Sequence, residues 1–76
     1  MQEEFREYYK MLGLKVAYYR KLKGLTQERL ADLMDVDTSF IGQIEAPNIT
    51  KAISMDTLFR ISKALDTPPH KFLSFD

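Results

Sequence analysis

The sequence contains no cysteine and a single histidine. A disulfide framework is therefore excluded, and so is a zinc site built from cysteine and histidine. No run of about eighteen apolar residues is present, which excludes a membrane-spanning helix. The chain begins with Met-Gln-Glu-Glu, which is acidic where a secretory signal is basic. We therefore expect a cytoplasmic protein with no membrane partner, stabilised by an apolar core.

The sequence also lacks an excess of either charge, with 11 basic and 11 acidic residues. The charges are unevenly distributed, because six of the bases lie between Lys10 and Arg29, beside the single acid Glu28. The stretch from Leu30 to Glu45 carries four acids and no base. Phosphate contacts supply much of the affinity of DNA-binding proteins, so such contacts would have to come mainly from the first third of the chain.

Glycine and proline are scarce, with three of each, and most of them fall where an apolar helical pattern breaks. Residues 3–23 have apolar side chains at three- and four-residue spacing, which predicts a first helix ended by Gly24. Gly13 interrupts this run, so residues 1–11 are either an extension of the helix or a separate N-terminal arm.

Four further helices are predicted from capping residues and apolar spacing. Thr26 caps the second, Asp37 caps a third over residues 38–46, and Ser54 caps the fourth. Thr67 followed by Pro68 at the first helical position opens a short last turn that reaches Phe72. With no strand pattern and short connections, we predict an all-α fold, a compact five-helix bundle forming one domain over residues 1–76.

Residues 26–46 form the most informative segment. Apolar residues have the spacing that two helices need to pack across a tight turn: Leu30, Ala31, Met34, Val36, Ile41 and Ile44. Asp35 occupies the turn, where a left-handed backbone is expected and aspartate is tolerated. This pattern predicts a helix-turn-helix, in which the second helix enters the major groove and presents its N-terminal residues to base edges.

The chain resembles the Cro/C1-type helix-turn-helix family of phage repressors and bacterial regulators, also called the xenobiotic-response-element family. The resemblance runs from about Leu12 to Phe72. It rests on Leu12-Gly13, Val16, Tyr19-Arg20, Gly24-Leu25-Thr26-Gln27-Glu28-Arg29-Leu30-Ala31, Ile41, Ile44-Glu45, Ile53-Ser54, Leu58, Ile61, Ala64-Leu65, Pro68 and Phe72. It implies a lambda-repressor-like fold and sequence-specific binding of double-stranded DNA, in a transcriptional regulator that acts as a repressor without a cofactor.

The resemblance also implies roles for individual residues. The base-reading positions of the recognition helix are occupied by Thr38, Ser39 and Gln43. Gln27 matches a glutamine that contacts the phosphate backbone. Arg20 and Glu45 match a charged pair that ties the first helix to the end of the third.

The sequence departs from the family pattern after Glu45. The family often has Arg-Gly or Asn-Gly there, whereas this chain has Ala46-Pro47-Asn48. Asn48, Thr50 and Lys51 are candidates to supply the missing backbone contact, and Lys23 is a further phosphate candidate. The recognition helix has no arginine or lysine, so the commonest guanine contact is absent from it.

Aromatic residues exceed what one small core can bury. We expect an exposed apolar patch formed by Phe5, Tyr8, Tyr9, Tyr18, Phe72 and Phe75. Such a patch suggests a symmetric homodimer through the termini. With the neutral net charge, it also favours the alternative of a protein-interaction module, such as the antitoxin of a toxin–antitoxin pair. We do not expect an enzyme, since the sequence has no nucleophile–base set and no nucleotide-binding loop.

Overall fold

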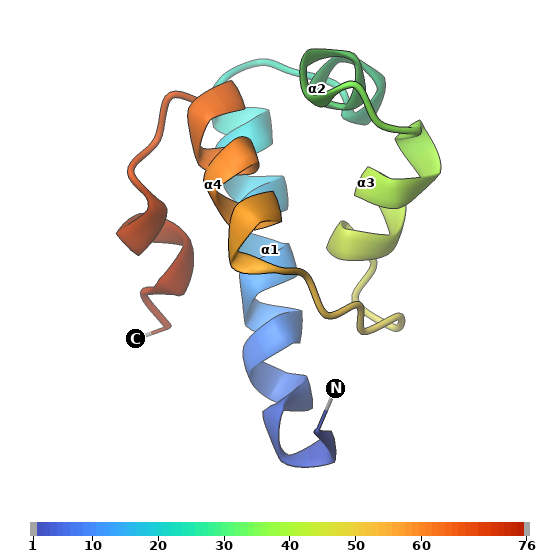
Figure 1. Ribbon diagram of the computed structural model, residues 1–76, viewed down its shortest axis with the longest axis vertical. Helices are drawn as coiled ribbons and strands as arrows, with labels where there is room; N and C mark the ends of the chain where they lie inside the picture. Colours follow the sequence, from blue (N-terminus) through green and yellow to red (C-terminus); the bar gives the residue numbers. More distant parts are fainter. Residues whose placement is uncertain (1, 76) are drawn as a thin grey trace.

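The computed structural model describes residues 2–75, and within that range the chain is all-helical, with no strand. Met1 and Asp76, the outermost residues of the predicted domain, lie outside the described residues. The elements are η1 (Glu3–Phe5), α1 (Arg6–Leu22), α2 (Gln27–Met34), α3 (Thr38–Glu45), α4 (Met55–Ala64) and η2 (Pro69–Leu73). The long α1 has α3 on one side and η2 on the other, as Figure 1 shows.

The predicted five-helix count is wrong in detail. Residues 2–75 contain four α-helices, and the last predicted helix, η2, is a 3₁₀-helix. Its predicted start is also wrong, because Pro68 is the N-cap and Pro69 is the first helical residue. Thr67 does not cap it, since its hydroxyl donates to the carbonyl oxygen of Leu65 at 2.9 Å.

α1 is continuous through Gly13, so of the two alternatives the helix extension is correct and the separate arm is not. The N-terminal segment continues α1 through the 3₁₀ turn η1, and Figure 1 shows this end projecting below the other helices. Arg6 donates two hydrogen bonds to Glu3 across this turn, and the contact holds the pKa of the Glu3 carboxyl below its usual range. At the other end, Gly24 has φ 74°, as predicted for the residue that stops the helix.

The core lies where α1, α2, α3, α4 and η2 meet. Its buried apolar side chains are Leu12, Val16, Leu30, Ala31, Met34, Ile41, Ile44, Leu58, Ile61, Leu65 and Phe72. Phe72 is fully buried, which removes it from the predicted surface patch. α1 is the longest of the described helices, and none of them is long and apolar enough to cross a membrane.

Candidate nucleic-acid interface

The helix-turn-helix consists of α2, the turn at Asp35 and α3. Thr26 caps α2, because its hydroxyl oxygen accepts a hydrogen bond of 3.0 Å from the backbone N–H of Arg29. Asp35 ends α2 with φ 56° and ψ 49°, the left-handed conformation predicted for it. The turn closes with the backbone N–H of Val36 donating to the carbonyl of Ala31 at 3.0 Å.

α3 has an exposed polar face and a buried apolar face. Thr38, Ser39 and Gln43 are exposed, as expected for the face that reads bases. Ile41 and Ile44 point into the core. Asp37 is the N-cap residue, but among residues 2–75 its side chain makes no capping hydrogen bond. The helix is therefore held mainly by its buried face.

Arg20 and Glu45 form a buried ion pair between α1 and the last residue of α3, as the family resemblance implies. Arg20 Nε donates to Glu45 Oε2 at 2.8 Å, and Nη2 donates to Oε1 at 2.9 Å. Both residues are 8% exposed, and Arg20 Nη1 also donates to the carbonyl of Leu25 at 2.7 Å. This two-pronged geometry fixes the angle of α3 as well as its distance from α1.

Gln27 takes part in the same network, which the sequence did not indicate. Its side-chain nitrogen Nε2 donates to Glu45 Oε1 at 3.0 Å. Its oxygen lies near Gly42, where an added β-carbon would be 3.6 Å from Oε1. The side chain assigned to phosphate thus bridges α2 and α3, while its backbone N–H lies at the start of α2.

Gly13 has a packing role that the sequence analysis missed. A β-carbon at this position would overlap the carbonyl oxygen of Ile44, so α1 and α3 approach each other along their backbones. The glycine that suggested a helix break therefore permits the close contact between the first helix and the recognition helix. The signal available in the sequence was a glycine in the middle of an otherwise periodic helix.

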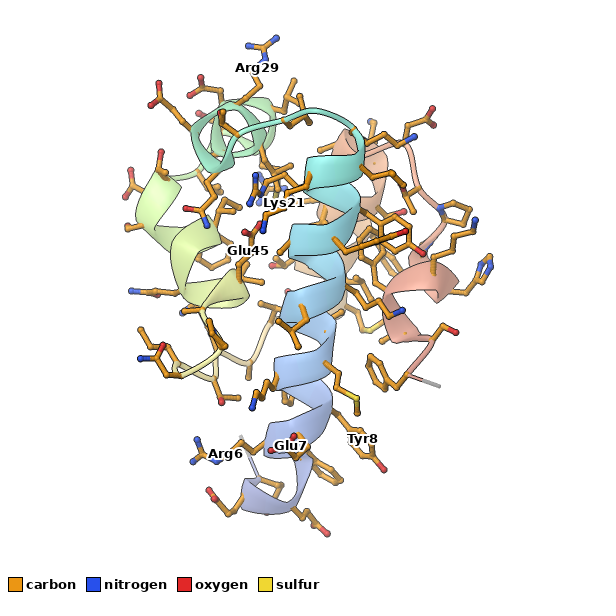
Figure 2. All side chains as sticks on the ribbon, turned by 180° about the vertical axis from the view of Figure 1, so that it is seen from behind. Arg6, Glu7, Tyr8, Lys21, Arg29 and Glu45 are labelled. Atoms are coloured by element: carbon orange, nitrogen blue, oxygen red, sulfur yellow. The ribbon has the colours of Figure 1, made fainter. Side chains whose placement is uncertain are left out.

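The phosphate candidates lie in two places, at the junction of α1 and α2 and in the loop after α3. Lys23 is exposed at the end of α1, and Asn48 is exposed in the loop after α3. Thr50 and Lys51 are half-buried in that loop, and Lys51 Nζ lies 5.4 Å from the centre of the Phe40 ring. Arg29, which was not among the candidates, is exposed in the first turn of α2 and projects away from the domain in Figure 2.

The aromatic surface at the termini is partly as expected. Phe5 stacks on Tyr8 and Tyr8 stacks on Phe75, with ring centres 6.4 and 6.0 Å apart. These three rings line a shallow hollow of about 270 Å³, together with Tyr9, Leu12, Ile53, Ser54, Met55, Leu58 and Leu73. We call the exposed part of this region the terminal surface: Phe5, Tyr8, Met55 and Leu73. Tyr18 is not part of it and lies farther along α1.

No group of three metal-binding side chains occurs in the part of the chain that the structure describes.

The family model described as helix-turn-helix matches residues 16–72. The control protein C.SmaI of Serratia marcescens is 30% identical over 70 residues, which cover 92% of this chain and 81% of that protein.

The fold is similar to the crystal structure of the restriction-modification controller protein C.AhdI from Aeromonas hydrophila. The TM-score is 0.76 at 30% sequence identity, over 84% of this chain and 94% of that chain. Both relatives are controller proteins, which supports the regulator interpretation over the antitoxin alternative.

Proposed function

The chain belongs to the helix-turn-helix family of DNA-binding transcription regulators, and from that premise we propose that it reads its operator as a symmetric homodimer through α3. The observation that carries this proposal is the exposed polar face of α3, with Thr38, Ser39 and Gln43 outward on a helix anchored from behind. Gln43 has the amide geometry for a bidentate contact to adenine. Thr38 and Ser39 can hydrogen-bond several base edges and so discriminate more weakly.

Phosphate contacts would come from the elements that border α3. The N–H groups at the start of α2, including that of Gln27, suit an anion because they lack partners within the helix. Lys23 and Arg29 are exposed close to them in the chain, and Asn48 is exposed in the loop after α3. Thr50 and Lys51 lie in the loop after α3 and would extend the contact along the backbone.

The Lys51 ammonium group rests over Phe40, on the helix that would enter the groove. This contact would hold the charge beside the recognition helix, ready to meet a phosphate. The proposed phosphate contacts therefore include Lys23 and Arg29 near the start of α2 and Lys51 after α3, although α3 itself has no basic residue.

The terminal surface is the proposed homodimer contact. Phe5, Tyr8, Met55 and Leu73 are each more than 40% exposed, and together they surround one apolar hollow. Dimers of this class bind half-sites about one helical turn apart, so the operator would be palindromic. A Leu73→Glu substitution should weaken dimerisation in sedimentation equilibrium while the circular dichroism spectrum stays helical.

The names of the two relatives suggest the regulatory setting. We propose that this chain likewise controls genes of a restriction–modification system, and that it represses by occupying an operator that overlaps a promoter. A reporter driven by the promoter of the adjacent genes should respond to the wild-type chain but not to one with Gln43 replaced by Ala.

The proposal is tested by selecting bound sequences from random duplex DNA at low salt. We expect enrichment of one palindromic site, and binding should weaken steeply as salt rises because phosphate contacts release counterions. Absence of any enriched site would contradict sequence-specific reading. An enriched site without palindromic symmetry would contradict the dimer but not the reading by α3.

A further inference from the structure

α1 has a second apolar face that the domain does not cover. Besides the face that packs into the core, it carries an outer stripe formed by Met11, Leu14, Tyr18 and Leu22. Leu14 is 48% exposed, Tyr18 57% and Leu22 64%. Their spacing of three and four residues places them on one side of the helix. In Figure 2, α1 lies in front of the other elements, with nothing over it.

Two opposite charges lie symmetrically along this stripe. Glu7 and Lys21 are seven residues before and after Leu14, which is about two turns of helix in each direction. Both side chains are exposed, so they extend the line of Leu14 on the same side of α1. The bases Arg6 and Lys10 also precede Leu14, but Arg6 is paired with Glu3 and Lys10 is half-buried, so Glu7 is the exposed charge two turns before Leu14.

The charges on this side of α1 are complementary to those on a second copy of α1 that runs in the opposite direction. Two parallel copies of α1 would place Glu7 beside Glu7 and Lys21 beside Lys21. Two antiparallel copies centred on Leu14 would instead place Glu7 of each copy beside Lys21 of the other. The charges therefore select a second copy in the antiparallel direction, and an isologous two-fold contact has that symmetry.

We propose that a second copy of this chain packs against the outer stripe of α1 in the antiparallel direction, about a two-fold axis at Leu14. Leu14 then meets Leu14, and Met11 of each copy lies against Tyr18 of the other. A hollow of about 450 Å³ beside the stripe, lined by Met11, Leu14, Lys15, Tyr18, Tyr19 and Phe75, offers room for the incoming tyrosine ring. Two symmetry-related Glu7–Lys21 pairs close the ends of the contact.

This contact is separate from the terminal surface and does not depend on DNA binding. The residues that carry it lie on α1 between Glu7 and Leu22, whereas the terminal surface is formed by Phe5, Tyr8, Met55 and Leu73. In a homodimer made through the terminal surface, those four residues would be covered, and Leu14 and Tyr18 would stay available for a second contact. Phe75 borders both hollows, but the substituted residues are not shared, so each contact can be weakened by its own substitutions.

The charge pairs give the sharpest test. In the Leu73→Glu background, sedimentation velocity without DNA at low salt would compare Glu7→Lys, Lys21→Glu and an equimolar mixture of the two. Each variant alone should associate on the order of tenfold more weakly, because two attractive pairs become two repulsive ones. In the mixture, both pairs between unlike chains again join an acid to a base, and association should return to the level of the unmutated stripe.

Two matched variants control for net charge. Glu28→Lys on α2 and Lys63→Glu on α4 make the same charge changes away from the stripe and should leave association unchanged. Leu14→Glu should abolish it, with helicity checked by circular dichroism. A mixture that associates no better than its components, or controls that weaken association equally, would overturn the proposal. Neither result would affect operator binding by α3.

Discussion

The two faces of α3 differ in how they are held. Three sets of contacts hold its inner face. The Ile41 and Ile44 side chains are buried in the core. The Arg20–Glu45 pair and the close approach of Gly13 tie the helix to α1. Its outer face carries side chains that are free in solvent. The difference teaches that the residues that orient this eight-residue helix are separate from the residues proposed to read bases. Substitutions on the inner face should therefore change stability, and those on the outer face should change binding.

The largest effect is expected from Glu45→Ala. It leaves the Arg20 guanidinium buried without its carboxylate, and breaking a buried pair costs about 3–5 kcal/mol of unfolding free energy. Urea denaturation followed by circular dichroism measures the loss. The double variant Arg20→Met, Glu45→Leu removes both charges and should recover most of that stability. Equal instability of the single and double variants would show that the pair itself is not the cause.

Gly13→Ala should cost about 3 kcal/mol of unfolding free energy, the upper end of the usual overpacking penalty. The added methyl overlaps the Ile44 carbonyl, so α1 and α3 must separate. Intrinsic helix propensity alone predicts the opposite sign, a gain of about 1 kcal/mol. Thermal denaturation of this variant therefore decides between the two effects, and a higher melting temperature would contradict the close contact.

Gln43→Ala tests the outer face. We expect a loss of about 1–3 kcal/mol in binding to the selected operator, the worth of a bidentate base contact. Fluorescence anisotropy with labelled duplex measures it, and the melting temperature should not change because the side chain is exposed. Asp32→Ala, an exposed change on α2, is the matched control. Unchanged affinity for the best site would remove Gln43 from the reading face.

The smallest effect on stability is expected from the N-cap residues of α2 and α3. Thr26→Ala removes the hydrogen bond to the Arg29 N–H and should cost about 1 kcal/mol of unfolding free energy. Asp37→Ala at the start of α3 should cost less, because no capping bond from its side chain occurs among residues 2–75. Chemical denaturation of both variants compares them, and equal losses would contradict the difference between the caps.

Local chemistry made much of the fold predictable. Asp35 was expected to be left-handed because it lies between two helical patterns separated by a tight turn, and Gly24, Thr26 and Ser54 were likewise correct as terminal residues. The Arg20–Glu45 pair came from the family resemblance, since residues so far apart in the chain show no local pattern. The assignment of Thr38, Ser39 and Gln43 to the outer face of the helix also came from the resemblance, and these three side chains are exposed.

The errors arose where tertiary contact outweighs local preference. Gly13 has poor helix propensity, but its fit against the Ile44 backbone depends on a helix distant in the sequence. Phe72 was assigned to the surface with the other aromatic residues, whereas the core is completed by this ring from η2. Gln27 was given only a phosphate role, because its bond to Glu45 exists only once α2 and α3 are packed.

The bond between Gln27 and Glu45 has a consequence for the shape of the DNA. It links the start of α2, the proposed phosphate contact, to the end of α3, and Arg20 braces both against α1. The distance between the proposed phosphate contact and α3 is therefore set by the protein. The groove of a bound duplex must widen or narrow to match that distance. The energy of this deformation depends also on base pairs that the protein never touches. We therefore expect the sequence of the operator to be restricted at uncontacted flanking base pairs, through the flexibility of the DNA, as well as at the contacted bases.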